Sequence, residues 1–281
     1  MALYERIKRH FASPAPGLET RVFVHLMRHG EAYHKLGHVH GQVNPQSYAI
    51  PDPFLTDEGN EQAKSAREYM AERCPVPHIV LTSPLARTVE TALHVFPTTT
   101  SGSITSQPQI VAYDDLRECG PFLCNVRQGV SELADEYNNK GVDFSALSPV
   151  IPPMHSVIRA EQRAEMVSKE LLRIAKMIRK GGGIWKGVYV KGPAGQSVGW
   201  PLRTYVMEDI HIVVISHGTF MKYLLPLSHT FQPFWRKFKA AEIRTYMIDA
   251  DGHLHETPES KGTRSTTVSR KVSSIFTSAS R

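Results

Sequence analysis

Short β-branched runs alternate with helical patterns along most of this chain, and the alternation restricts the folds that it can adopt. Buried strands are predicted at 21–27, 78–82, 110–113, 209–216 and 242–248. Helices are predicted between them, at 56–73, 83–96, 159–180 and 218–225. This order predicts an α/β fold, here a three-layer α/β/α sandwich around a mainly parallel central sheet.

Residues at the expected helix ends support these assignments. Thr56 is a candidate N-cap, and the acids that follow it suit the positive end of a helix dipole. Ser83 and Pro84 are predicted as the N-cap and first residue of the next helix. The glycines at 181–183 are predicted to end the long helix.

The chain is predicted to form one domain with additions. We expect an N-terminal extension at 1–20, an α/β domain at 21–256 and a flexible, basic, Ser/Thr-rich tail at 257–281. Segments 114–157 and 181–208 interrupt the alternation and are predicted to be inserted cap or loop segments. Four aromatic residues of the second segment either line a substrate lid or pack onto the body, and the sequence leaves both open: Trp185, Tyr189, Trp200 and Tyr205.

Composition excludes several classes of protein. The chain of 281 residues is 41% hydrophobic and 21% charged, which is typical of a globular protein. Its 33 basic and 27 acidic residues give +6, but segment 257–281 holds five of the bases and one acid, so the remainder carries only +2. Without a basic stripe interleaved with aromatics, we expect no nucleic-acid partner. The apolar runs fall short of the roughly 18 residues that span a bilayer, so we expect no membrane partner.

Cysteine usage and the start of the chain indicate the compartment. The three cysteines, Cys74, Cys119 and Cys124, are an odd number and lack the spacing of a metal site. Charged residues interrupt the first segment, which therefore does not resemble a signal peptide. We expect a reducing, cytoplasmic location.

Polar residues with related chemistry follow four of the predicted strands. Arg28 and His29 end the first, Arg87 follows the second, Glu118 follows the third, and His217 follows the fourth. Because ligands of open α/β sheets bind beyond the carboxyl ends of the strands, we expect these side chains to meet at one edge.

That set of side chains suits phosphoryl transfer through a histidine. Arg28 and Arg87 offer forked guanidinium donors for phosphate oxygens, and His217 adds a further donor. His29 is the candidate nucleophile, because neighbouring guanidinium groups disfavour its protonated form. Glu118 is the candidate acid for the leaving oxygen, and the sequence leaves three rivals for that role: Asp114, Asp115 and Glu31.

The chain resembles the histidine phosphatase superfamily, also called the phosphoglycerate mutase-like family, on the branch that contains the mutases. The resemblance covers most of 22–248 and rests on the runs at 26–31, 55–63, 83–92, 116–118 and 216–218. It implies a phosphorylated nucleophile at His29, a phosphate pocket of Arg28, Arg87 and His217, and a proton donor at Glu118. It also implies the α/β/α fold, no cofactor and no metal.

One position departs from the family pattern. Six residues after the nucleophile, where relatives often carry an asparagine that touches phosphate, this chain has Lys35. A lysine there either supplies another cation to an anionic substrate or points to solvent. We include Lys35 among the candidate substrate-binding residues.

The sequence therefore predicts a metal-independent phosphatase that hydrolyses a small phosphomonoester. A phosphomutase and a catalytically weak phosphate-binding protein are the alternatives, and the oligomeric state is left open. A zinc site among the histidines at 25–40 is the less favoured reading, because His25 lies in an apolar strand and is expected to be a hydrogen-bonded core residue. His34, His38 and His40 are expected at the surface or the pocket rim.

Overall fold

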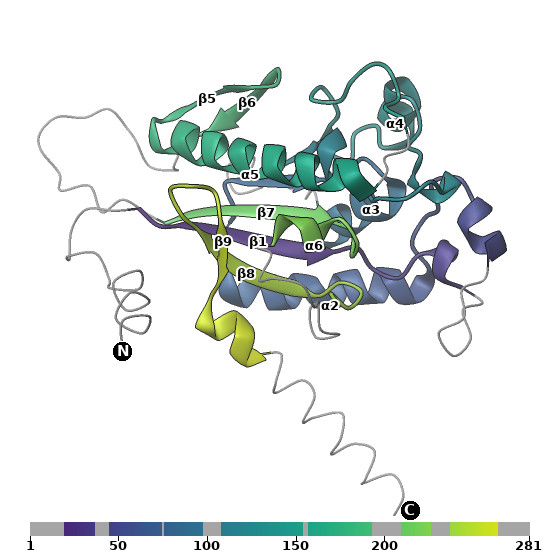
Figure 1. The fold of residues 1–281 in the computed structure, drawn as a ribbon, viewed down its shortest axis with the longest axis horizontal. Coiled ribbons are helices and arrows are strands. Elements are labelled where there is room, and N and C mark those ends of the chain that lie inside the picture. The colour runs from purple at the N-terminus through teal and green to yellow at the C-terminus, as the bar shows by residue number, and fades with distance from the viewer. Residues whose placement is uncertain are drawn as a thin grey trace, which may run out of the picture.

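The central element of the protein is a seven-stranded sheet (Figure 1). The computed structural model describes residues 20–36, 45–74, 76–97, 108–153, 157–192, 209–225 and 237–263. The strands follow the order β4-β3-β2-β7-β1-β8-β9 across the sheet. Their bounds are β1 Val22–Arg28, β2 Ile79–Thr82, β3 Gln109–Ala112, β4 Val142–Asp143, β7 Ile210–Ser216, β8 Ile243–Ile248 and β9 Leu254–Glu256. The first five strands in this order pair in parallel, while β8 and β9 are antiparallel, so the mainly parallel sheet is confirmed.

Helices cover both faces of the sheet, which confirms the three-layer sandwich. One face packs against α2 (Asp57–Arg73) and α3 (Ala86–Val95). The other packs against α5 (Val157–Arg179) and α6 (Met221–Leu224) (Figure 1). A smaller core forms around α4 (Val130–Glu136). None of the described helices is long and apolar enough to cross a bilayer.

The register of the central strands brings their carboxyl ends level. Arg28 of β1 pairs with Ser216 of β7, and Thr82 of β2 pairs with Ile215 of the same strand. The peptide N–H groups that follow continue the ladder, because His29 donates to Ser216 O at 3.1 Å and Ser83 donates to Ile215 O at 3.0 Å. The residues after three neighbouring strands therefore emerge at one edge.

Two predicted helix starts have different outcomes. Thr56 caps α2 as expected, with its hydroxyl accepting the Gly59 N–H at 3.0 Å. The predicted start of α3 at Ser83 is wrong, because the helix begins at Ala86 after Leu85. The Ala86 N–H is bound instead by the Asp52 carboxylate at 2.8 Å, which is a cap supplied from a distant loop.

Segment 181–208 is more ordered at its start than the sequence suggests. It opens with a hairpin of β5 (Gly182–Trp185) and β6 (Val188–Lys191) beside the end of α5 (Figure 1). Trp185 is fully buried, and its indole N–H donates to Glu170 at 2.6 Å, so it packs onto the body. Tyr189 is exposed, whereas Trp200 and Tyr205 lie outside the described residues.

The first residues of the segment predicted as a flexible tail, 257–263, are attached to the sheet. Residues 258–263 form a helical turn after β9, where polar contacts hold the chain to β8. Thr257 N–H donates to Thr245 O at 3.0 Å, and the Ser260 hydroxyl accepts the Thr245 N–H at 3.1 Å. The apolar content of the sequence did not reveal this attachment, because the attachment consists of hydrogen bonds.

Helix α6 is shorter than predicted, covering only Met221–Leu224.

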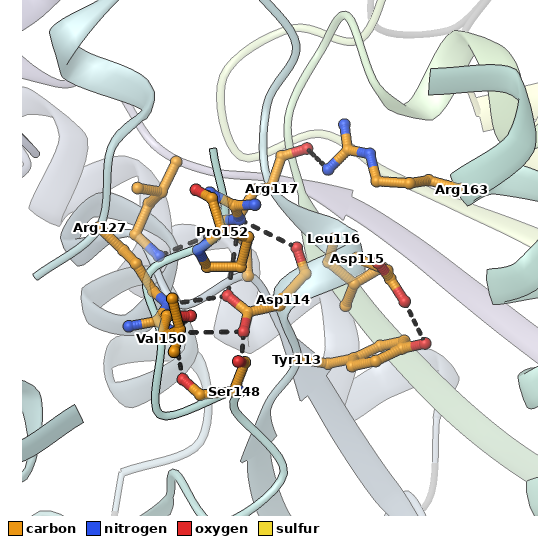
Figure 2. Close-up of polar contacts among 12 residues, drawn as sticks. Tyr113, Asp114, Asp115, Leu116, Arg117, Arg127, Ser148, Val150, Pro152 and Arg163 are labelled. Carbon is orange, nitrogen blue, oxygen red and sulfur yellow. Dashed lines mark hydrogen bonds and ion pairs between the residues drawn. The ribbon is translucent and has the colours of Figure 1, made fainter. Parts of the chain in front are cut away.

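A buried ion-pair network holds the segment that follows β3 (Figure 2). The Asp114 carboxylate accepts from Arg127 Nε at 2.8 Å and from the Ser148 N–H at 3.0 Å. The Arg117 guanidinium lies 3.5 Å from the same carboxylate. Arg163 then donates to the Arg117 carbonyl at 3.0 Å. One carboxylate thus compensates two buried cations and fixes the course of the loop that leads to Glu118.

Substitution of Asp114 should destabilise the fold strongly. Asp114→Asn keeps the shape of the side chain but leaves the Arg117 and Arg127 charges buried without a counter-ion, so we expect a loss of about 3–5 kcal/mol in the free energy of unfolding. Urea denaturation measures it. Glu165→Gln, which removes an exposed ion pair with Lys169, is the control and should leave the midpoint unchanged. Equal midpoints for both variants would contradict the stabilising role of the network.

Candidate active site

The two candidate histidines meet where β1 and β7 end. The His29 and His217 rings lie 5.1 Å apart between centroids and are tilted by 57°. Both side chains are buried, with residue exposures of 3% and 0%. The strand register brings these residues together, as the sequence analysis expects.

The hydrogen bond of His29 fixes its tautomer. Its Nδ1 lies 2.6 Å from the Gly30 carbonyl oxygen, which can only accept, so Nδ1 carries the proton. The neutral ring therefore keeps its lone pair on Nε2. A Cβ on Gly30 would lie 2.5 Å from the Gly59 carbonyl oxygen, so only glycine allows this turn to approach α2 so closely.

Two guanidinium groups lie beside these rings, and the first of them along the chain, Arg28, is partly exposed. Arg87 is fully buried and donates to the Cys124 carbonyl at 2.7 Å and to Asn125 Oδ1 at 3.1 Å. Arg28 donates to the Phe238 carbonyl at 2.7 Å. Within the described part of the chain, neither guanidinium forms an ion pair with a carboxylate and neither Nε has a hydrogen-bond partner. The site therefore keeps buried positive charge and spare donors for an anion.

This charge also sets the protonation of the histidines. Burial, and then the Arg87 and Arg28 charges, hold the pKa of His29 well below its usual value. Burial and Arg87 lower the pKa of His217 in the same way. Both rings are therefore neutral at neutral pH, which leaves His29 Nε2 available as a nucleophile.

Ser83 joins the site through His217. The Ser83 hydroxyl lies 2.8 Å from His217 Nε2, and this contact joins the end of β2 to the end of β7. The sequence analysis assigns Ser83 to a helix cap and misses this contact. Its position directly after a predicted strand was the available signal, since that is where the other site residues were found.

Glu118 is held against the segment that follows His217. Its carboxylate accepts the Thr219 N–H at 3.1 Å and the Phe220 N–H at 2.9 Å, and it also accepts the N–H of Cys119. Its negative charge reaches both Arg28 and Arg87, raising the pKa of each against the effect of burial. Glu118 is therefore close to the cationic site.

The three rival acids have other partners. Asp114 belongs to the buried network around Arg127. Asp115 accepts the Tyr113 hydroxyl at 2.5 Å, and Glu31 accepts the Thr56 hydroxyl at 3.1 Å. Of these four acids, Glu118 is the one whose charge acts on both Arg28 and Arg87.

A 3₁₀ turn at Tyr33–Lys35 forms another side of the site. His34 is buried, with its ring 5.8 Å from that of His29, so a surface position for it is excluded. Lys35 donates to the Tyr48 hydroxyl at 3.0 Å and lies over that ring. His38 and His40 lie outside the described residues. Among described residues, the groups with metal-ligand geometry do not include His29, His34 or His217.

Titration of the buried histidines provides a direct test of this electrostatic environment. The His29 resonance in histidine-labelled protein should keep its neutral chemical shift as the pH is lowered through about 6.5, the ordinary imidazole midpoint. The His29→Asn variant assigns the signal. Because the unfolded chain takes up protons in this range while the folded chain does not, the free energy of unfolding should fall as the pH drops below that midpoint. A His29 signal that titrates near 6.5 would contradict the argument.

Comparisons with the sequences of known proteins find similarity to phosphatases. The sequence model of the histidine phosphatase superfamily (branch 1) matches residues 24–176. A probable phosphatase of Schizosaccharomyces pombe is 26% identical over 154 residues, which are 53% of this chain and 65% of that protein. The chain thus spans a little under two thirds of this relative.

Solved structures with low sequence identity are also similar. The ecdysone phosphate phosphatase of Bombix mori, in complex with tungstate, is 15% identical, with a TM-score of 0.49 over 82% of this chain and 93% of that one. The phosphoserine phosphatase of Entamoeba histolytica, in complex with 3-phosphoglyceric acid, is 16% identical, with a TM-score of 0.43 over 84% and 95%. On the sequence match, which covers more than half of its length, this chain belongs to the histidine phosphatase superfamily.

Proposed function

We propose that the protein is a phosphatase that hydrolyses a small phosphomonoester through a phosphohistidine at His29. The observation that carries the proposal is a pair of guanidinium groups, the fully buried Arg87 and the partly exposed Arg28, beside a neutral His29 whose Nε2 keeps its lone pair. Such a site favours a dianion, because a bound phosphate supplies the counter-charge that the described carboxylates do not provide as direct partners. Family membership and the phosphatase name of the yeast relative support the same chemistry.

In the first half-reaction, His29 Nε2 attacks phosphorus and the bond to the leaving oxygen breaks. Arg28, Arg87 and His217 stabilise the charge on the three peripheral oxygens during this transfer. Glu118 takes up a proton from solvent as the anionic substrate binds, and then gives that proton to the leaving oxygen. In the second half-reaction, Glu118 takes a proton from water, the water oxygen attacks phosphorus, and the P–N bond breaks to release phosphate. The nucleophile and the acid are both side chains, so the scheme needs no metal.

Lys35 supplies an additional cation to the substrate in this proposal. Burial raises the pKa of the Cys124 thiol, and the charges of Arg87 and then Lys35 act against that rise. Lys35 therefore lies in the neighbourhood of the residue whose carbonyl holds Arg87. Its bond to Tyr48 places a constraint on that role, because the ammonium group must keep or exchange this partner when substrate binds.

Trapping the phosphorylated enzyme tests the nucleophile. Wild-type protein mixed with an aryl phosphate and quenched in base, which preserves phosphohistidine, should gain the mass of one phosphoryl group and release phosphate on longer incubation. His29→Asn should do neither, because it lacks the attacking nitrogen. The matched control is His94→Gln, which replaces a histidine of α3 that is bonded to Asn60 of α2. This variant should behave as wild type.

The products decide between the proposed function and its alternatives. A phosphate group that moves to a second hydroxyl of a phosphoglycerate, instead of appearing free, would identify a mutase and contradict hydrolysis. Tight binding of phosphoesters without any mass gain would identify a phosphate-binding protein.

Substitution of Glu118 tests the proton donor separately. Glu118→Gln keeps the side-chain shape but removes the acid, so turnover should fall about 10²–10⁴-fold. With an aryl phosphate whose leaving group needs little protonation, phosphorylation should continue and dephosphorylation should slow, so that phosphoenzyme accumulates. Asp115→Asn is the control at a rival acid and should retain turnover. If the two variants showed equal losses, the assignment to Glu118 would be wrong.

A further inference from the structure

A second cluster of chemically capable side chains lies on the sheet face that packs against α2. His25 comes from the middle of β1, His211 from the start of β7, and Cys74 from the end of α2. One nitrogen of each ring and the Cys74 sulfur all lie within 4.8 Å of one another. His25 and Cys74 are buried, while His211 is partly exposed and leaves a route from solvent.

The two imidazoles are already close to the spacing of metal ligands. His25 Nε2 lies 3.0 Å from His211 Nδ1, and the pair shares one proton. Two nitrogens bound to one tetrahedral zinc ion at about 2.0–2.1 Å are separated by roughly 3.3 Å. Binding a metal ion therefore lengthens the distance between these two nitrogens by only a few tenths of an ångström, while both rings turn so that their lone pairs meet at the ion.

The surroundings of the histidine pair suit ligation. The other nitrogen of His25, Nδ1, lies 3.0 Å from the Thr245 hydroxyl, which can orient the ring as outer-shell partners of metal sites do. Burial lowers the pKa of His25 to about 3 and also lowers that of His211, so both rings are neutral. Near His211, the Asp209 carboxylate is paired with Arg21 at 2.6 Å, so it is already committed to another partner.

Cys74 completes the set with a soft ligand. In the part of the chain that the structure describes, its thiol forms no hydrogen bond, and it packs among apolar residues such as Ala66 and Met70. Its backbone N–H donates to the Met70 carbonyl at 2.8 Å, which fixes its position at the helix end. A thiolate with two imidazoles is a donor set that selects borderline-soft ions, with zinc the first among them.

We propose that His25, Cys74 and His211 bind one zinc-type divalent ion, with solvent in the fourth position. The Cys74 S–H bond loses its proton to solvent as the metal–sulfur bond forms. The proton held between the two rings moves, through solvent, to the other nitrogen of the ring that carries it, so both imidazoles bind as neutral ligands. The ion joins the end of α2 to the two strands that carry His29 and His217. His25 precedes His29 by four residues, roughly 13 Å along a strand, so the ion is separate from the phosphate site.

Cobalt binding provides a direct readout of this site. Full-length protein is stripped with a chelator, dialysed and titrated with Co²⁺. We expect one ion per chain, a near-ultraviolet thiolate-to-cobalt charge-transfer band, and displacement of cobalt by Zn²⁺. Cys74→Ser should abolish the band, whereas Cys119→Ser, which changes a buried thiol bonded to Arg163, should keep it.

A second variant separates ligation from folding. Thr245→Val keeps a β-branched residue in β8 but removes the partner of His25, so Zn²⁺ affinity should fall about 10–100-fold while circular dichroism stays unchanged. Absence of stoichiometric binding, or a charge-transfer band that survives Cys74→Ser, would overturn the proposal. So would binding that is lost in Asp249→Asn, because it would assign the metal to the exposed group of Asp249, Asp251 and His253.

Discussion

The parallel register of β1, β7 and β2 is the constraint on which the rest of the structure depends. Pairing of Arg28 with Ser216 and of Thr82 with Ile215 leaves three strand ends level. A slip of one residue would turn His25 and Met27 to the opposite face and separate His29 from His217. Strands β1 and β7 also carry His25 and His211. The backbone hydrogen bonds between these two strands therefore position the candidate active site and the second cluster of His25, Cys74 and His211.

The positive charge at the strand ends is only partly compensated by nearby carboxylates. Arg87 is fully buried, and the carboxylate that most strongly opposes its loss of charge is Asp52. Burial raises the pKa of Asp52 itself to about 7, so this group neutralises the arginine only in part near neutral pH. The stability lost by burying cations in this way is recovered when an anion binds. In the proposed reaction, the same imbalance favours a doubly charged phosphate.

The sequence predicted the sheet, its layers and the five strand-end residues because each depends on local patterns and on one general rule about strand ends. It missed Ser83 as a partner of His217 and Asp52 as the cap of α3, since both contacts join segments far apart in the chain. It also missed the attachment of 258–263, which relies on hydrogen bonds from Ser260. Apolar periodicity carries no information about such polar, long-range contacts.

Two pairs of arginines in the protein differ in whether a carboxylate compensates their charge. Arg117 and Arg127 share the Asp114 carboxylate, so their charges are compensated within the fold. Those contacts hold the loop before Glu118, whose carboxylate is then fixed by two amides that follow His217. Arg28 and Arg87 bind carbonyl oxygens and one side-chain amide oxygen, which orient a guanidinium without cancelling its charge. The ion pairs at Asp114 thus hold a loop, whereas Arg28 and Arg87 keep their charge for an anion in the proposed function.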